Sequence, residues 1–264
     1  KVICSSGGNA GNAVAAACEQ LGLPCDVYVP VTTLPMMIEK IRKRHMTNVH
    51  VGGANWNAAN AFALEALEKQ GDSGLYVPPY DHPLIWKGNS TMVDEILQDC
   101  DGDPTKFPKV IVLSVGGGGL LRGVQMGLER LGLSNHTQIF AVETTGTASF
   151  AAAKKAGKIV SLDKIDSIAS SLGALSVVEA TLNSPVKTTS FVVSDAEAVD
   201  ACYEFVNESR VLVEPACGAA LAMTNPRLRR AFEEVESAVF VVCGGGAISL
   251  ETLDAFRQKV CTAL

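Results

Sequence analysis

The sequence predicts an α/β protein built on open parallel sheets, and three features of the chain support this. Short apolar segments alternate with longer helical ones along most of the 264 residues, as expected when parallel strands are connected by covering helices. Three glycine-rich turns each separate an expected strand from an expected helix. Pro78 and Pro79 interrupt the alternation, so we expect two domains, 1–78 and 79–264.

The first domain alternates short apolar strands with helices whose ends carry local signals. Gly22 and Pro24 end an alanine-rich helix, because neither residue continues a helix well. Thr33 with Glu39 brackets the start of the next helix. The expected strands are 2–4, 27–29, 48–51 and 75–77, and the expected helices are 12–21, 33–44 and 57–69.

The second domain opens irregularly, because Pro83 prolongs the proline-rich break. Its first helix is therefore expected only over 91–98. Ser194 and Glu197 have the spacing of a capping box, which predicts a helix beginning there. Ser237–Cys243 predicts a further buried strand. The other expected strands are 110–113, 138–142 and 189–193. The helix that follows the strand 110–113 is expected to end at about Leu131, and the remaining expected helices are 149–156, 176–183, 195–207, 214–222 and 249–259.

The segment Ile111–Gly123, IVLSVGGGGLLRG, carries the strongest functional signal. Glycines let a ligand approach the main chain, and the following helix start offers unpaired N–H groups that bind a phosphate. The P-loop motif is absent because Val124 and Gln125 follow, and Arg122 replaces the last glycine of the dinucleotide fingerprint. A small monophosphorylated cofactor remains, with a glycine-rich turn that binds no ligand as the alternative.

Composition argues against several other classes of function. The net charge is −6 and the basic run at Lys40–Arg44 reads as a solvated helix face, so no nucleic-acid surface is expected. No apolar run approaches the roughly 18 residues of a membrane span, and no signal peptide opens the chain. The eight cysteines form no CxxC pair, and the four histidines show no metal-ligand spacing. Scattered free cysteines suit a reducing compartment, so a cytoplasmic location is expected.

Five motifs in order along the chain resemble those of the L-serine dehydratases, which are fold-type II pyridoxal phosphate (PLP) enzymes: SSGGNAG, YVPPYDHPLIWKG, SVGGGGLLRG, LVEPACGAAL and VVCGGG. The resemblance implies two open parallel-sheet domains like those of tryptophan synthase β, with the cofactor in the cleft between them. It implies β-elimination of L-serine to pyruvate and ammonia, and of L-threonine to 2-oxobutanoate. A cytoplasmic homodimer that binds a small-molecule amino acid and acts in amino-acid catabolism and gluconeogenesis is expected on the same ground.

The resemblance also assigns the groups that would hold the cofactor. Asn9 would donate a hydrogen bond to O3′ of the ring. Cys243 would face the pyridine nitrogen, where its weak S–H donor cannot protonate the ring. That arrangement suits β-elimination, because the electrons leave with the β-hydroxyl group. Main-chain N–H groups would hold the phosphate at Gly116, Gly117, Gly118, Gly119 and Leu120.

Substrate and cation sites follow from the same resemblance. Tyr80 would line the substrate pocket near the domain hinge. The substrate carboxylate would lie at a helix start formed by Ser6, Gly7, Gly8, Asn9 and Ala10. A monovalent cation such as K⁺ would be bound by Glu143 and by the carbonyl groups of Thr147, Leu172 and Ala174.

Four of these side chains have alternative roles that the residues alone leave open. Asn9 could simply cap the following helix. Cys243 could be a core residue of a buried strand. Glu143, at the end of a strand, could be solvated, and Tyr80 could be a packing residue of a proline-rich turn.

The lysine that forms the Schiff base is the one component of the resemblance that has no match. In the family this lysine lies in an S-F-K-x-R-G motif well upstream of the SSGGNAG loop. Only eight residues precede Asn9, and Lys1 stands at the wrong distance from it. We therefore expect no catalytic lysine within this chain, so that either an N-terminal segment is missing from it or the product is truncated and inactive.

Three alternative functions remain. Serine racemases of this fold carry a serine at the position of Gly7, and they and the threonine deaminases usually carry histidine at the position of Ala10. Regulated threonine deaminases add a C-terminal domain, whereas this chain ends soon after its last expected helix. The third alternative is a pseudoenzyme, because fold alone does not fix function.

Overall fold

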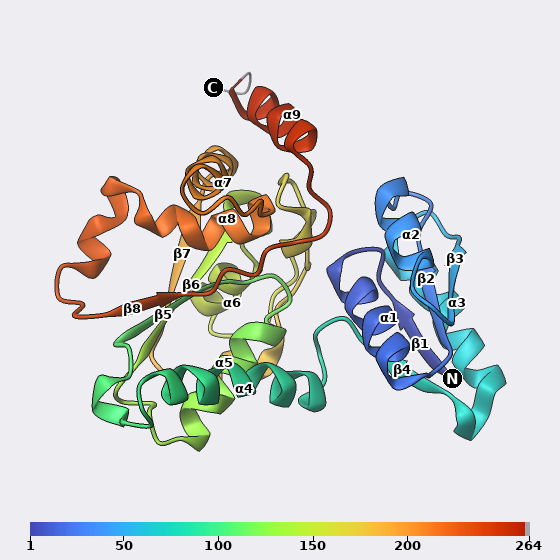
Figure 1. Cartoon of the computed structure of the whole chain (residues 1–264), viewed down its shortest axis with the longest axis horizontal. Helices are drawn as coiled ribbons and strands as arrows, with labels where there is room; N and C mark the ends of the chain where they lie inside the picture. Colours follow the sequence, from blue (N-terminus) through green and yellow to red (C-terminus); the bar gives the residue numbers. More distant parts are fainter. Residues whose placement is uncertain (262–264) are drawn as a thin grey trace. The chain divides into compact units, whose positions relative to one another are not determined.

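The computed structural model describes residues 1–261, which form two compact units that meet in sequence at Pro79 and Tyr80. Each unit is an open sheet of four parallel strands with helices on its faces (Figure 1). The expected architecture of parallel-sheet α/β units is therefore confirmed.

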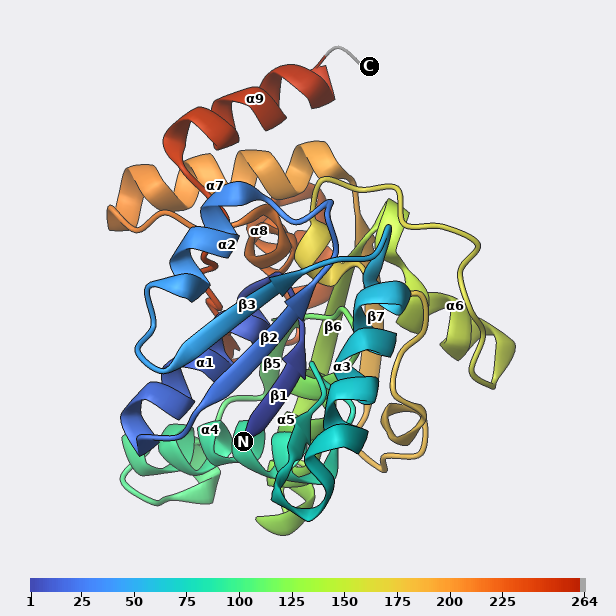
Figure 2. The same cartoon turned by 90° about the vertical axis from the view of Figure 1, so that its right-hand side faces the viewer.

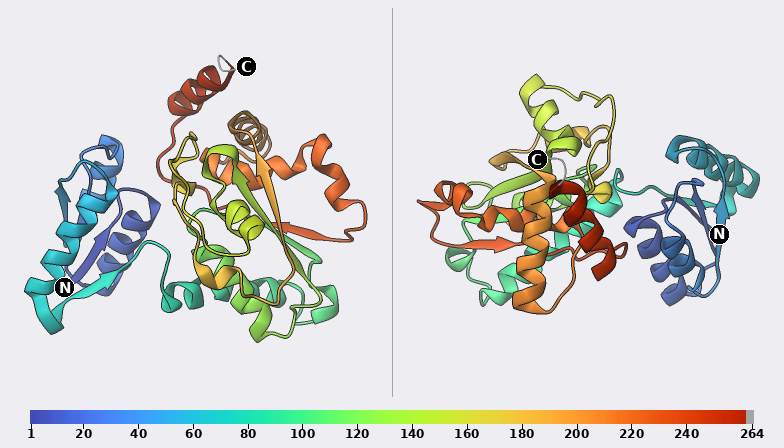
Figure 3. Two further views of the ribbon diagram at one scale, coloured as in Figure 1. Left: turned by 180° about the vertical axis from the view of Figure 1, so that it is seen from behind. Right: turned by 90° about the horizontal axis from the view of Figure 1, so that it is seen from above.

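The first unit has the strand order β3-β2-β1-β4. Helices α1 and α2 cover one face of this sheet and α3 covers the other (Figure 2; right-hand view of Figure 3). Small side chains let α1 approach the sheet closely, because Ala15 and Cys18 lie buried in one cluster with Val27. The elements are β1 (Val2–Ser5), α1 (Asn9–Leu21), β2 (Cys25–Val29), α2 (Pro35–Arg42), β3 (Thr47–Val51), α3 (Trp56–Gln70), η1 (Gly71–Ser73) and β4 (Leu75–Val77).

The second unit has the strand order β7-β6-β5-β8, all parallel. Its helices are α4 (Pro83–Asp99), α5 (Gly119–Arg130), α6 (Ser149–Ala156), α7 (Asp195–Ser209), α8 (Pro215–Leu221) and α9 (Leu250–Cys261). Its strands are β5 (Val110–Ser114), β6 (Gln138–Thr144), β7 (Thr188–Val193) and β8 (Ala238–Phe240). Short 3-10 turns connect them, namely η2 (Pro104–Lys106), η3 (Thr145–Thr147), η4 (Ser170–Leu172), η5 (Glu179–Thr181), η6 (Ala222–Thr224) and η7 (Pro226–Phe232).

The side chains of β5 alternate between two hydrophobic cores, as the two-residue period of a strand requires. Val110 and Val112 lie in a buried cluster with residues of α7 and α8. Ile111 and Leu113 point to the opposite face and pack with residues of α4 and α5. Figure 1 shows these helix pairs on the two sides of the sheet, and α9 beside α7. A strand buried on both faces explains the continuous apolar run in the sequence.

The expected start of the first helix of this unit is wrong. The helix was expected from Thr91, but α4 begins at Pro83. Proline is favoured at the first helical position, where its missing N–H group has no helical partner to lose. His82 caps the helix by accepting a hydrogen bond from the N–H of Leu84 at 3.1 Å. The proline that reads as a break in the sequence is therefore a helix start.

Two further expectations differ from the structure. The helix expected over 176–183 is reduced to the short turn η5, because the N–H of Val178 donates outward to the carbonyl of Gly117 at 2.9 Å. The strand expected over 237–243 ends at Phe240, and its residues are only partly buried. By contrast, the capping box of α7 is confirmed, since Ser194 and Glu197 exchange hydrogen bonds of 2.8 and 3.2 Å.

Candidate active site

The first glycine-rich turn joins β1 to α1 in the first unit. Helix α1 begins at Asn9, three residues before the expected start, with Gly8 as N-cap and no capping side chain. A side chain at Gly11 would collide with the carbonyl oxygen of Ser6, so glycine is required for the turn to fold back onto the helix. The residues from Ser6 to Ala10 thus form a helix start whose N–H groups suit a carboxylate.

Two of the predicted site residues in this turn acquire a definite position. Asn9 is the first helical residue, so its side chain does not occupy the N-cap position. Gly7 lies against α2's leading segment, because a Cβ atom placed there would approach Cγ2 and Oγ1 of Thr33 to 2.5 Å. Thr33 therefore restricts which side chain residue 7 can carry, and this contact cannot be predicted from the local sequence.

The second glycine-rich turn joins β5 to α5 in the second unit. Gly118 is the N-cap and has a left-handed backbone with φ of 89°, which glycine adopts most readily. No side chain caps the helix, so the positive end of a 12-residue helix meets the turn without a protein anion. Such a helix start binds phosphate.

Neighbouring segments hold this turn by filling the space beside each glycine. The ring of Tyr80 lies where a side chain of Gly117 would be, and the Tyr80 carbonyl oxygen would be 2.7 Å from a Cβ at Gly119. The Cα of Leu172 would be 3.0 Å from a Cβ at Gly116. All of these glycines are therefore needed for packing as well as for main-chain access.

Tyr80 consequently packs against the glycine-rich turn between β5 and α5 of the second unit. Its carbonyl oxygen accepts a hydrogen bond from the indole N–H of Trp86 at 3.0 Å, which anchors the residue to α4. Burial raises the pKa of the Tyr80 hydroxyl, with Asp81 adding to the effect, so the phenol stays neutral.

The third glycine-rich turn follows β8 and contains Cys243. The expectation of a buried strand at Cys243 is wrong, because pairing with β5 ends before it and the residue is exposed. Gly244 and Gly245 then take φ values of 78° and 126°, which bend the chain sharply. Although the residue as a whole is exposed, desolvation of its sulfur, together with Cys217 and Glu214, raises the pKa of the Cys243 thiol to about 11. The thiol is therefore neutral at physiological pH.

Glu143 is fully buried at the end of β6, so the alternative of a solvated carboxylate is wrong. Its two carboxylate oxygens accept hydrogen bonds from the N–H groups of Phe150 and Ala151, at 2.7 and 2.8 Å. They cap the first turn of α6. Burial nevertheless raises the pKa of Glu143 to about 7, against the effect of these two bonds.

The other residues of the predicted cation site are mostly buried as well. Thr147 is fully buried and shares a hydrogen bond of 2.8 Å with the hydroxyl of Thr144. The carbonyl of Leu172 accepts a hydrogen bond of 2.8 Å from the N–H of Ala174. A cation would have to share the carboxylate oxygens of Glu143 and the carbonyl oxygen of Leu172 with the N–H groups from which they already accept hydrogen bonds. Among residues 1–261, no three His, Cys, Asp or Glu side chains gather as metal ligands.

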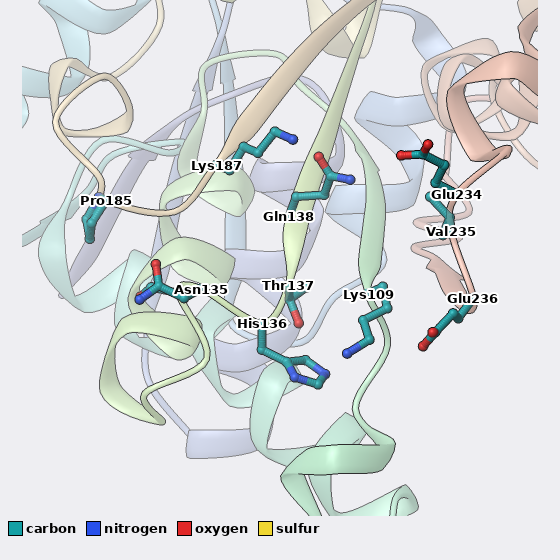
Figure 4. Close-up of a pocket in the computed structure, with 11 residues that line it drawn as sticks. Lys109, Asn135, His136, Thr137, Gln138, Pro185, Lys187, Glu234, Val235 and Glu236 are labelled. Carbon is teal, nitrogen blue, oxygen red and sulfur yellow. The ribbon is translucent and has the colours of Figure 1, made fainter.

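A pocket of about 410 Å³ lies at the opposite edge of the second sheet (Figure 4). Lys109, Gln138 and Lys187 line it where β5, β6 and β7 begin, and Glu236 lies just before β8. The glycine-rich turns follow the carboxyl ends of β5 and β8, where ligands of open parallel sheets bind. This pocket is therefore not part of the candidate active site.

Glu214, like Thr33, has a role that is not predicted from the sequence. It is almost fully buried just before α8, and its carboxylate accepts a hydrogen bond from the N–H of Ala247, just after the third glycine-rich turn. Its presence in the motif LVEPACGAAL was the available signal, because an acidic residue within an apolar run needs a partner.

None of the helices in residues 1–261 has both the length and the apolar character that a membrane span requires.

Comparison with known proteins agrees with this arrangement. The L-serine dehydratase of Dictyostelium discoideum is 40% identical over 264 residues, which cover 98% of this chain and 75% of that protein. The L-serine dehydratase/L-threonine deaminase of Mus musculus is 42% identical, with 98% and 80% covered. The crystal structure of a fungal L-serine ammonia-lyase from Rhizomucor miehei matches with a TM-score of 0.85 at 35% identity, covering 98% of this chain and 81% of that one. A family model described as pyridoxal-phosphate dependent enzyme matches residues 1–244, and the chain therefore belongs to this family.

Proposed function

We propose that this protein is an L-serine ammonia-lyase that converts L-serine to pyruvate and ammonia, and L-threonine to 2-oxobutanoate and ammonia. The observation that carries the proposal is the similarity, at about 40% identity over nearly the whole chain, to proteins named for these two activities. The glycine-rich turns at the starts of α1 and α5, and Cys243 beyond β8, are the local features that suit it.

The turn before α5 fits the phosphate group of PLP. It is lined by glycines whose Cβ atoms would strike neighbouring residues, so main chain and not side chain meets a ligand. The uncapped helix start adds N–H donors and the positive end of the dipole. We assign the phosphate to the N–H groups from Gly116 to Leu120. When bound, PLP withdraws electrons from the substrate's α-carbon.

The chain's own residues then orient the reacting groups. The helix start from Ser6 to Ala10 would bind the substrate carboxylate, and Asn9 would donate a hydrogen bond to O3′ of the cofactor. Cys243 would be the residue beside the pyridine nitrogen, and with a pKa of about 11 it is a neutral thiol. As a weak donor it would leave that nitrogen unprotonated, which suits loss of the β-hydroxyl group.

Tyr80 has a packing role that the structure describes and a substrate role that we propose. Its ring supports Gly117 of the phosphate-binding turn, so it holds the cofactor site in shape. We also propose that it bounds the substrate pocket. The cation K⁺ is proposed at Glu143 and the carbonyl groups of Thr147, Leu172 and Ala174, where the buried carboxylate supplies the only negative charge of the set.

We also propose a cellular compartment, an oligomeric state and a metabolic role for the enzyme. All eight cysteines are free within residues 1–261, which suits a reducing compartment such as the cytoplasm. We propose a homodimer of two units per subunit, 1–78 for the substrate loop and 79–264 for PLP. Pyruvate as product fits amino-acid catabolism that supplies gluconeogenesis.

The proposal is tested with the product of the complete reading frame, purified and supplied with PLP. We expect pyruvate and ammonia in equal amounts from L-serine, 2-oxobutanoate from L-threonine, and no pyruvate from D-serine. A lactate dehydrogenase-coupled assay follows pyruvate, and glutamate dehydrogenase follows ammonia. Absence of ammonia release from both substrates in the PLP-loaded protein would overturn the assignment.

A further inference from the structure

Glu214 stands at the junction of three segments of the second unit. It is the residue before α8, but its carboxylate does not cap that helix. One carboxylate oxygen accepts a hydrogen bond of 2.7 Å from the N–H of Ala247, and the other accepts 2.6 Å from the hydroxyl of Ser171. The carboxylate thus connects the turn that follows Cys243 with the turn η4.

The main chain makes the same connection a second time. The N–H of Glu214 donates to the carbonyl of Gly244 at 2.9 Å. Gly245 packs directly against the Glu214 side chain and has φ of 126°, so no other residue would fit this turn without strain. Residues 244 to 247 are therefore held on two sides by Glu214.

Burial strengthens the two hydrogen bonds that the Glu214 carboxylate accepts from Ser171 and Ala247. Glu214 is 5% exposed, and hydrogen bonds to a charged acceptor in such a site are about twice as strong as neutral ones. The α8 residue Cys217 contacts the same turn, because its sulfur accepts hydrogen bonds from the N–H groups of Gly244 and Cys243; burial nevertheless raises the pKa of the Cys217 thiol, against the effect of these two bonds. Two residues of the motif LVEPACGAAL therefore hold the segment that carries Cys243.

We propose that Glu214 is a positioning residue, which acts through its two carboxylate hydrogen bonds to fix the turn from Cys243 to Ala247 and hence the direction of the Cys243 thiol. The consequence for catalysis rests on the proposed function, in which that thiol faces the pyridine nitrogen of PLP. The hydrogen-bonded position itself does not depend on that function.

Two substitutions separate geometry from charge. Glu214→Gln keeps the shape: its amide oxygen can accept from the N–H of Ala247, and its NH₂ group can donate to the hydroxyl of Ser171. Glu214→Asp keeps the charge, but a side chain one methylene shorter cannot reach both partners. Ser171→Ala is the matched control, because it removes one partner and leaves the bond to Ala247 intact.

The first measurement is amide hydrogen exchange of the peptide containing residues 243–249, on the protein without PLP. We expect the N–H of Ala247 to remain protected in the wild type, Glu214→Gln and Ser171→Ala. In Glu214→Asp it should exchange at least about tenfold faster, as expected when a local hydrogen bond opens. Equal protection in all four proteins would overturn the positioning role.

The second measurement is steady-state kinetics of the PLP-loaded enzyme with L-serine. A misplacement of about 1 Å can reduce a rate about 100-fold, so Glu214→Asp should lower kcat by about 10- to 100-fold with little change in KM. Glu214→Gln should stay within about threefold of the wild type. The reverse order, with Asp active and Gln inactive, would show that charge is what matters and would overturn the proposal.

The two measurements also separate this inference from the proposed function. If no variant, the wild type included, releases ammonia from serine, the proposed function fails while the exchange result still decides whether Glu214 fixes the turn. If the wild type is active and exchange is unchanged in Glu214→Asp, the proposed function stands and the positioning role fails.

Discussion

At the scale of single residues, Gly7 and Gly117 must be glycine because neighbouring residues fill the space that a side chain would need. Thr33 lies beside Gly7, and the Tyr80 ring lies beside Gly117. Substitution at either glycine therefore changes packing as well as chemistry. Tests at these positions need a partner substitution or a matched variant that makes the same steric change.

Gly117→Asp should abolish retention of PLP. The new side chain would have to displace the Tyr80 ring, and its carboxylate would lie beside the turn proposed to bind the phosphate dianion, where like charges about 4 Å apart repel by several kcal/mol near a protein surface. We expect the affinity for PLP, measured by equilibrium dialysis, to fall at least about 100-fold below that of Gly117→Asn. Asparagine makes the same collision with Tyr80 without the charge. Equal affinities of the two variants would contradict phosphate binding at this turn.

Gly7 is expected to set the choice between elimination and racemisation. A hydroxyl group at residue 7 could return a proton to the α-carbon on the opposite face, whereas glycine supplies none. A positioned acid is worth about 10² to 10⁴ in rate, so Gly7→Ser should produce measurable D-serine. Because Thr33 would collide with the new side chain, the substitution is combined with Thr33→Ala, and Thr33→Ala alone is the control. Chiral chromatography of the serine pool measures the outcome, and substantial D-serine from the unmodified enzyme would indicate a racemase.

The pKa of the Cys243 thiol can be read from its reactivity. Only the thiolate is alkylated, so with a pKa of about 11 the rate with iodoacetamide should rise about tenfold per pH unit from pH 8 to 10. No plateau should occur below about pH 11. Peptide mass spectrometry follows residue 243, and the urea-unfolded protein serves as reference with an ordinary thiol pKa near 8.5. A plateau near pH 9 in the folded protein would show that the surroundings do not disfavour the thiolate.

At the scale of elements, the start of α7 is a helix end whose mechanism is visible in both sequence and structure. The hydroxyl of Ser194 accepts from the N–H of Glu197, and the Glu197 carboxylate accepts from the N–H of Ser194. Ser194→Ala should cost about 1 kcal/mol of unfolding free energy, or about 2–4 °C in Tm for a unit of this size. Glu197→Gln keeps an acceptor oxygen and should change Tm by less. Thermal unfolding followed by circular dichroism checks both, and an unchanged Tm in Ser194→Ala would mean that the cap contributes nothing.

The elements also show where local sequence is a sufficient guide. Apolar runs located the central strands β1 and β5, because a strand buried on two faces carries a continuous apolar sequence. Residues whose effect depends on position were harder to interpret: Pro83 starts a helix, whereas proline in a helix interior would interrupt it. The segment 176–183 looks helical in isolation, but the hydrogen bond from Val178 to Gly117 takes its backbone away from a helical path. Contacts between distant residues of this kind cannot be read from neighbouring letters.

At the scale of the whole molecule, some parts of the candidate site can be predicted from the sequence and others cannot. The three glycine-rich turns were visible because glycine runs between strands and helices have few other uses. Named roles for Asn9, Cys243 and Glu143 came from family resemblance, and they stay predictions. Thr33 and Glu214 were not found, because their roles depend on folding of the chain around Gly7 and Gly245. The residues that support a site are thus the least visible part of it.

The proposed cation couples several elements of the second unit, and its removal tests that coupling. Leu172, whose carbonyl is a proposed ligand, lies against Gly116 of the phosphate-binding turn, while Glu143 caps α6. Replacing K⁺ with tetramethylammonium at equal ionic strength should therefore weaken PLP binding, by about tenfold for a coupling free energy of 1–3 kcal/mol. In Glu143→Gln, which lacks the negative charge, the two salts should give the same affinity for PLP. If the wild type also binds PLP equally in both salts, K⁺ does not bind at a site linked to the phosphate turn.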